Sequence, residues 1–150
     1  MNEGLTWALF ENSPFPCCLV GRGGKFMDCN YKWIELTGYS KTELLTMTFA
    51  DITEPADIYS DIEEARKLSE KRYRSSYTID KTYIRKDGKR VKFKLIVNSV
   101  FHEGRFMYFV SFALPVKKNK IIITSYCYIL IILLQIINII VSIFGNCNKV

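Results

Sequence analysis

The sequence has few of the residues on which most enzymatic mechanisms depend. Among its 150 residues there is one histidine, His102, and there is neither a glycine-rich phosphate loop nor a kinase motif. Acid–base and nucleophilic catalysis use histidine more than any other side chain. The five cysteines include no CxxC pair, which disfavours a zinc cluster or a disulfide framework. We therefore expect a protein that is not an enzyme and that has no metal site.

The charges do not indicate a nucleic-acid-binding protein. Lys and Arg number 21 against 15 Asp and Glu, for a net charge of +6. Acidic residues prevail in 1–65 and basic residues in 66–94, but no helix is predicted to carry the basic run. We expect two differently solvated faces and no nucleic-acid partner. A basic surface for anionic lipid or an acidic partner is the alternative.

The last thirty residues differ in composition from the rest. No charge occurs in the 24 residues from Ile121 to Phe144, a length that can cross a bilayer core as a helix. Three lysines lie in the basic linker 117–120, and one lysine lies in the short tail 145–150. The positive-inside rule then predicts a single-pass membrane protein with residues 1–120 in the cytoplasm. A buried element or a low-complexity tail is the alternative.

Apolar periodicity divides the rest into a short amphipathic helix over 1–12 and an α+β domain over 13–116. Alternation and turn residues predict five strands, at 17–20, 25–29, 76–85, 91–101 and 106–114. Between the second and third strands the sequence predicts short helices, one over 31–37 and another from Pro55 with Ile58, Ile62, Ala65 and Leu68 on one face. The expected architecture is an antiparallel sheet with helices on one face.

Several residues have a clear local role in this plan. Asn30 is a suitable N-cap for the helix over 31–37, and Gly38 is suited to its left-handed C-cap. Ser40 and Glu43 have the spacing of a capping box. Asp87-Gly88 is a tight-turn signal between two strands.

With these features the sequence resembles a PAS domain of the S-box type, over about Leu9 to Pro115. The resemblance rests on LFENSPFPCCLV, on DCNYKWIELTGYSKTEL and on YIRKDGKRVKFKLIVNSV. It implies a PAS fold, with a five-stranded antiparallel sheet and short helices around a core that can be a ligand pocket. Such domains sense small molecules, redox state or light, or serve as dimerisation modules in signalling proteins.

The family's best-known cofactors do not suit this sequence. Light-oxygen-voltage relatives use a cysteine after the Gly-Tyr-Ser helix, and 45–52 has none. Their flavin-facing amides correspond approximately to Tyr83, Phe93 and Ala113, which carry no amide side chain. Haem-binding relatives use a histidine on the long helix, and 56–70 has none. No cofactor is predicted; non-covalent flavin or a metabolite stays open, with candidate pocket-lining residues Trp33, Tyr83, Phe93, Leu95, Phe109 and Ser111.

The last strand has a second apolar face. Phe93, Leu95 and Val97 should face inward beside Phe109 and Ser111, whereas Phe106, Tyr108, Val110 and Phe112 follow each other on the opposite side. An outward apolar face needs a cover. The N-terminal helix, with Leu5, Trp7 and Leu9, can supply part of it. We expect a homodimer, or pairing with another PAS-containing signalling protein.

Three functions follow. The first is a membrane-tethered, dimerising PAS module that regulates signalling without catalysis. The second is a small-molecule or redox sensor with a bound ligand, although the cysteines at 17, 18 and 29 are expected mainly as small buried hydrophobes. The third is a truncated fragment of a sensor kinase or transcription regulator.

Overall fold

The computed structural model describes residues 3–70 and 75–116. The elements there are the helices α1 (Glu3–Glu11), α2 (Tyr31–Thr37), α3 (Lys41–Leu44) and α4 (Pro55–Glu70), a 3₁₀ helix (Phe49–Ile52), and the strands β1 (Cys17–Val20), β2 (Phe26–Cys29), β3 (Ser76–Ile84), β4 (Arg90–His102) and β5 (Arg105–Pro115). The predicted strands are all present, and each bound agrees with the prediction to within one residue.

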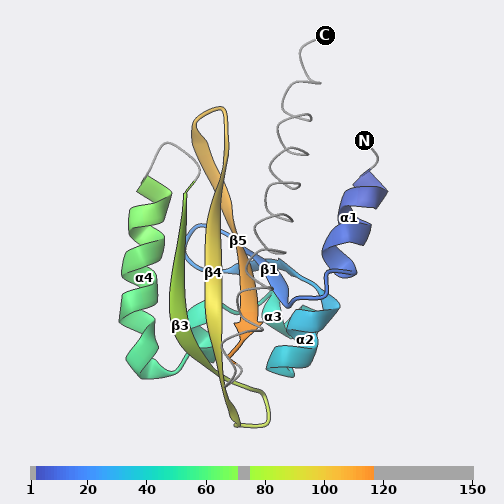
Figure 1. Ribbon diagram of the computed structural model, residues 1–150, viewed down its shortest axis with the longest axis vertical. Coiled ribbons are helices and arrows are strands. Elements are labelled where there is room, and N and C mark those ends of the chain that lie inside the picture. The colour runs from blue at the N-terminus through green and yellow to red at the C-terminus, as the bar shows by residue number, and fades with distance from the viewer. Residues whose placement is uncertain (1–2, 71–74, 117–150) are drawn as a thin grey trace. The chain divides into compact units, whose positions relative to one another are not determined.

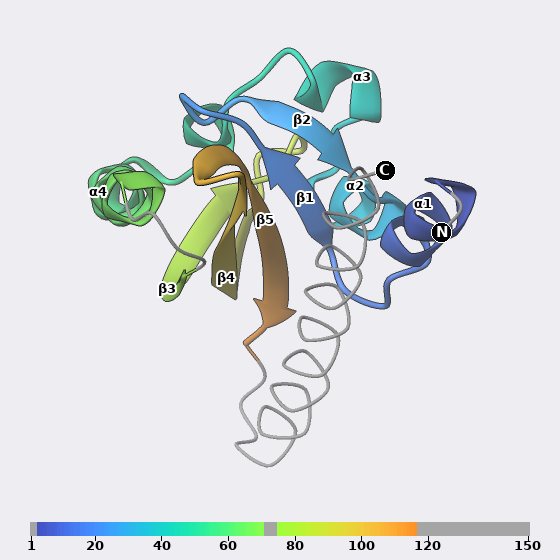
Figure 2. The same ribbon diagram turned by 90° about the horizontal axis from the view of Figure 1, so that it is seen from above.

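The five strands form one sheet in the order β2-β1-β5-β4-β3, and all neighbouring strands are antiparallel (Figure 1). Helix α4 lies along β3 at one edge, and α2 lies beside β1 near the other edge (Figure 2). Helix α1 lies beyond α2. The α+β prediction of an antiparallel sheet with short helices is therefore confirmed.

The caps of α2 and α3 explain why these helices begin and end where they do. The Asn30 side chain accepts a hydrogen bond from the Trp33 backbone N–H at 2.9 Å, and Gly38 ends α2 with a φ of 78°. That left-handed value is easily adopted by glycine. Ser40 and Glu43 form the predicted capping box at the start of α3.

Asn30 also connects α1 to the sheet. Its amide nitrogen donates to the Phe10 carbonyl at 3.2 Å and to the Phe15 carbonyl at 2.9 Å, and its oxygen accepts from the Cys17 N–H at 2.9 Å. Asn30 is fully buried, and these bonds satisfy both ends of its amide. One residue therefore joins α1, β1 and α2.

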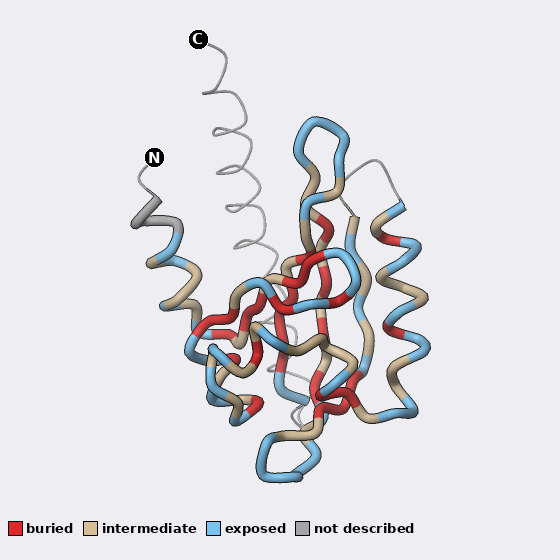
Figure 3. Tube along the Cα trace, turned by 180° about the vertical axis from the view of Figure 1, so that it is seen from behind, coloured by how far each residue is buried: buried red, intermediate tan, exposed pale blue. Residues whose placement is uncertain are grey.

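The predicted inner face of β4 and β5 is confirmed. Phe93, Leu95 and Val97 are buried, as are Phe109 and Ser111 on the neighbouring strand. The buried residues follow the middle of the central strands, while the hairpin ends are exposed (Figure 3). The core therefore lies between the inner face of the sheet and the helices α2 to α4.

The prediction for Phe106 was wrong. In β5, Tyr108 pairs with Val100 and Phe106 pairs with Phe101, which leaves Met107 as an extra residue in a β-bulge. The bulge reverses the alternation, so Phe106 packs against the core, with its ring centroid 4.6 Å from that of Phe109. The outward series of β5 therefore begins at Tyr108.

The predicted inner face of α4 also needs correction. Ile62 is 47% exposed, whereas the adjacent Asp61 is 2% exposed and Leu68 is buried. The helix is rotated so that a carboxylate, rather than Ile62, faces the sheet. The cause of this rotation is polar, because Asp61 pairs with Lys81 of β3.

Side chains of helix α1 that were expected to cover the sheet are exposed. Trp7 and Leu9 are 56% and 52% exposed, so these two side chains do not cover the sheet as predicted.

The predicted membrane segment 121–144 and its basic linker lie outside the described residues. Within 3–70 and 75–116, no helix is both long and apolar enough to cross a membrane.

Candidate functional site

A small cavity lies between α4 and the inner face of the sheet. Its volume is about 20 Å³, which is room for roughly one water molecule. The residues around it come from β1, the 3₁₀ helix, α4 and the three long strands: Val20, Phe49, Asp61, Ala65, Tyr77, Lys81, Tyr83, Leu95, Val97, Phe109 and Ser111. In this conformation the cavity fits neither a flavin nor a haem.

Charged and hydroxyl side chains gather at the α4 side of this cavity, which we call the ionic end and define as Asp61, Tyr77 and Lys81. The Lys81 ammonium on β3 forms an ion pair with the Asp61 carboxylate on α4, and neither side chain is more than 3% exposed. The Tyr77 hydroxyl donates to the other oxygen of Asp61 at 2.7 Å. Asp61 thus accepts from two residues of β3.

The Lys81 ammonium also faces aromatic rings. Its nitrogen lies 4.5 Å from the centre of the Phe49 ring and 4.9 Å from that of Tyr83, within the range of cation–π attraction. Desolvation lowers the pKa of Lys81, and the negative charge of Asp61 opposes this shift. Burial also raises the pKa of Tyr77, and the nearby Asp61 carboxylate raises it further.

A second carboxylate strengthens the contact between α4 and β3. Asp57, one turn before Asp61, accepts a hydrogen bond from the Thr82 backbone N–H at 2.8 Å. These two carboxylates on one side of α4 bond to consecutive residues of β3. Their bonds account for the rotation that leaves Ile62 outside.

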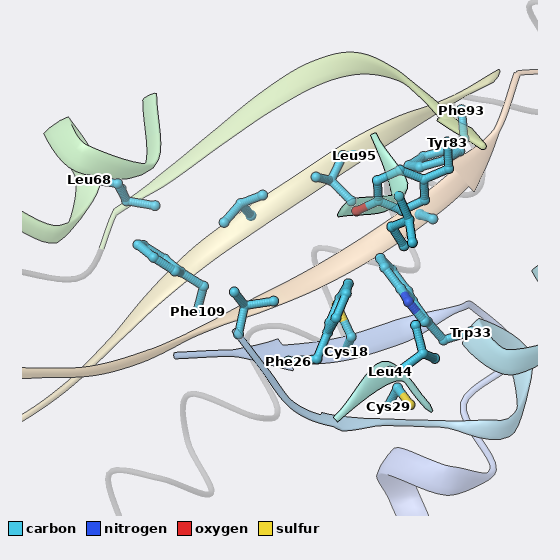
Figure 4. Close-up of a cluster of buried hydrophobic side chains, with 14 residues drawn as sticks. Cys18, Phe26, Cys29, Trp33, Leu44, Leu68, Tyr83, Phe93, Leu95 and Phe109 are labelled. Carbon is cyan, nitrogen blue, oxygen red and sulfur yellow. The ribbon is translucent and has the colours of Figure 1, made fainter. Parts of the chain in front are cut away.

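The opposite side of the core, which we call the aromatic end, consists of Phe26, Trp33, Tyr83 and Phe93 (Figure 4). Ring centroids are 6.1 Å apart for Phe26 and Trp33, 5.7 Å for Trp33 and Tyr83, and 4.7 Å for Tyr83 and Phe93. All three pairs have edge-to-face geometry, which aromatic quadrupoles favour. These rings fill the space near α2, and the cavity described above lies on the α4 side of the core.

Four of the six candidate pocket residues line the cavity, and two do not. Tyr83, Leu95, Phe109 and Ser111 line the cavity. Trp33 and Phe93 are buried in the aromatic end and do not line it. The Trp33 indole N–H is buried and has no hydrogen-bond partner among the described residues.

The ionic end was not predicted, although the sequence carries a signal for it. Lys81 has the same parity as Tyr77, Ile79 and Tyr83 on β3, so alternation places it inward. Asp61 is three residues after Ile58 and four before Ala65, on the apolar side of α4. Opposite charges at two inward positions are the pattern of a buried ion pair.

No group of three or more metal-ligating side chains occurs within residues 3–70 and 75–116. The described cysteines, Cys17, Cys18 and Cys29, are buried free thiols. Burial is the largest cause that raises the pKa of each of them.

Comparisons with known proteins agree on the family. The PAS domain family matches residues 14–114. A probable diguanylate cyclase, DgcE of Escherichia coli K12, is 31% identical over 102 residues, which are 67% of this chain and 9% of that protein. The chain therefore corresponds to a small part of this curated relative.

Solved structures show the same fold. A PAS domain from Colwellia psychrerythraea has a TM-score of 0.68 at 16% identity, with 77% of this chain and 98% of that chain covered. A PAS domain from a two-component sensor histidine kinase has a TM-score of 0.62 at 21% identity, with 73% and 92% covered. The sheet order, the helices on its inner face and the match over residues 14–114 together show that this chain belongs to the PAS domain family.

Proposed function

We propose that this chain is a non-enzymatic PAS module of the S-box type that regulates signalling through contacts with other protein surfaces. The observation that carries the proposal is the filled interior. Four aromatic rings occupy the space near α2, and about 20 Å³ of cavity is left beside α4. The cavity beside α4 is too small for a metabolite, which favours recognition through the surface of the module.

The outer face of the sheet supports self-association as the form of this contact. Tyr108 and Val110 on β5 and Ile96 on β4 point away from the core cluster and are only partly buried. Trp7 and Leu9 on α1 are more than half exposed. Apolar side chains exposed on one module are typical of an interaction surface. We propose a homodimer, or pairing with another PAS-containing protein, through α1 and this face.

Sedimentation of the full chain in mild detergent tests the dimer. Tyr108→Glu and Val110→Glu introduce a charge on the proposed face and should convert a dimer to a monomer. Thr78→Glu is the matched control, because Thr78 is exposed on the edge strand β3, away from β5. A monomer at tens of micromolar for the unsubstituted chain, or equal effects of the three substitutions, would contradict the proposal.

Tethering to a membrane is the second part of the proposal. It rests on the uncharged stretch 121–144 and on the lysines that precede it. Replacing Ile132 and Ile136 by arginine should move the protein to the soluble fraction, since a central arginine costs about 2.5–3.5 kcal/mol on insertion scales. If the unsubstituted protein is soluble without detergent, the segment does not span a membrane.

A small-molecule sensor is the second candidate function, and the ionic end is the observation that favours it. A buried, charged lysine beside a cavity is a common feature of ligand sites. A ligand larger than water would require α4 to move away from β3. Asp61→Asn should then change ligand affinity. A ligand that remains bound to the purified protein would favour this function over the first.

A further inference from the structure

Two of the buried cysteines lie directly opposite each other on neighbouring strands. Cys18 of β1 and Cys29 of β2 are Cα partners in the antiparallel ladder. The Asn30 backbone N–H donates to the Cys17 carbonyl at 3.0 Å. In an antiparallel ladder, this bond makes Cys17 and Asn30 the hydrogen-bonded pair and Cys18 and Cys29 the adjacent non-hydrogen-bonded pair.

That type of pair has the spacing that a disulfide requires. Cα atoms in non-hydrogen-bonded pairs are about 4.5 Å apart and their side chains are close, whereas disulfides span Cα separations of about 4.4–6.8 Å. Directly opposite residues share a face of the sheet, and both cysteines belong to the core cluster. Cys17 has the opposite parity and cannot form the same link.

In the reduced form the two thiols have different neighbours. Figure 4 shows Cys18 beside Phe26 and Cys29 beside Leu44. The Ser111 side chain acts against the rise that burial causes in the pKa of the Cys18 thiol. Because Cys18 and Cys29 are already directly opposite each other, closure of a disulfide requires no change of strand register.

The location of the pair shows how an oxidant can reach it. Burial raises the pKa of Cys29 to about 11 and that of Cys18 well above its usual value, so both thiols are protonated and unreactive while β2 is in place. However, β2 is a four-residue edge strand, and its pairing with β1 is irregular after Leu19. Short edge strands with few partners open more readily than central ones.

We propose that Cys18 and Cys29 are a dithiol modification site that closes to an intrachain disulfide, with a low-molecular-weight disulfide as oxidant. The Cys29 thiolate, formed when β2 opens, attacks one sulfur of the oxidant and releases one thiol. The Cys18 thiolate then attacks the mixed disulfide at Cys29 and releases the second thiol. The protein loses two electrons and two protons, and the oxidant gains them.

The link would fix the edge strand to the strand that carries the rest of the sheet. Cys29 precedes Asn30, whose side chain holds α1, β1 and α2 together. Oxidation would therefore lock the region that positions the N-terminal helix. This inference goes beyond the proposed interaction function and does not depend on it.

The test uses the full chain with Cys127→Ser and Cys147→Ser, so that the remaining cysteines are those of β1 and β2. The folded protein is equilibrated with oxidised glutathione, and its intact mass is measured. We expect the loss of two hydrogen atoms and a cross-link between the tryptic peptides 1–22 and 26–32. Amide exchange of 26–29 should be slower in the oxidised form.

Three matched variants identify the sulfur atoms. Cys17→Ser should keep the cross-link, whereas Cys18→Ser and Cys29→Ser should abolish it while the circular dichroism spectrum stays that of the folded domain. Should Cys18→Ser disturb the fold, Cys18→Ala replaces it. An unchanged mass of the folded protein at equilibrium, or a cross-link that survives loss of Cys18, would overturn the proposal. Neither result bears on whether the module dimerises.

Discussion

The two ends of the core attach a helix to the same sheet by different interactions, apolar packing at one end and charged groups at the other. At the aromatic end, Trp33 of α2 packs by ring edges against Phe26 and Tyr83, and it needs no charge. At the ionic end, Asp61 of α4 reaches the sheet through an ion pair with Lys81 and a hydrogen bond from Tyr77. Helix α2 is therefore held to the sheet by aromatic packing, and α4 is held in part by a buried ion pair.

The difference indicates which helix is more easily displaced. Apolar packing has no alternative partner in water, so α2 gains nothing by leaving the sheet. A buried ion pair repays only part of its desolvation cost, and both charges would be solvated again if α4 moved. The cavity also lies beside α4. We therefore expect structural responses of this module to begin at α4.

The largest expected effect is the loss of one charge at the ionic end. Asp61→Ala leaves the Lys81 ammonium buried without a carboxylate and should lower the free energy of unfolding by about 3–5 kcal/mol. The triple variant Asp61→Leu, Tyr77→Phe, Lys81→Met removes every polar group together and should be close to neutral or stabilising. Urea denaturation measures both, and a triple variant as unstable as Asp61→Ala would contradict this view of the pair.

A substitution at the aromatic end should lower the free energy of unfolding by a similar amount, but for a different physical reason. Phe93→Ala creates a cavity next to Tyr83, and we expect a loss of about 3–5 kcal/mol. Lys94→Ala is the control, because Lys94 is on the other side of β4 in an exposed pair with Asp80, and its effect should be within about 0.5 kcal/mol. Equal losses would mean that the register is shifted by one residue.

Stability should fall at alkaline pH, because burial raises the pKa of a tyrosine at each end of the core, Tyr83 at the aromatic end and Tyr77 at the ionic end. Burial raises the pKa of Tyr83, so above pH 10 the unfolded chain releases a proton that the folded domain keeps, and stability falls. Tyr83→Phe should remove about 1.4 kcal/mol of this loss per pH unit. Burial lowers the pKa of Lys81, so its contribution changes with the opposite sign and rises with pH up to 10.5. Denaturation of the unsubstituted chain and of Tyr83→Phe between pH 8 and 11 measures the difference between their slopes.

The smallest expected effect concerns charges on the outside of α4. Arg66 bonds to Glu63 and Glu70, but all three side chains are in contact with solvent. Because water and salt screen such pairs, Arg66→Ala should barely change stability, and 1 M NaCl should remove any difference that remains. A loss comparable to that of Asp61→Ala would mean that burial does not separate the two kinds of ion pair.

Local rules predicted the aromatic end well. The N-cap at Asn30, the glycine cap at Gly38 and the alternation of Phe93 and Leu95 each depend on a few neighbouring residues. Each of these features can be predicted from a short stretch of sequence, without knowing which distant residues it contacts. The family resemblance rested on the same positions, and the PAS fold followed from it.

The incorrect predictions concern side chains whose orientation depends on residues far away in the sequence. The bulge at Met107 depends on how β5 pairs with β4, and it turned Phe106 inward against the parity of its strand. The rotation of α4 depends on β3, whose Lys81 attracts Asp61. Treating lysine and aspartate as surface residues by default concealed a pair that the two inward positions would have indicated.

We propose that recognition by this PAS module takes place on its surface, because aromatic rings fill one end of its core and the cavity at the other end has a volume of about 20 Å³. Native mass spectrometry of the purified full chain, released from a detergent micelle, tests it most directly. We predict a dimer whose mass is that of two polypeptides alone. A monomer that carries a tightly bound organic molecule of metabolite size would contradict the claim.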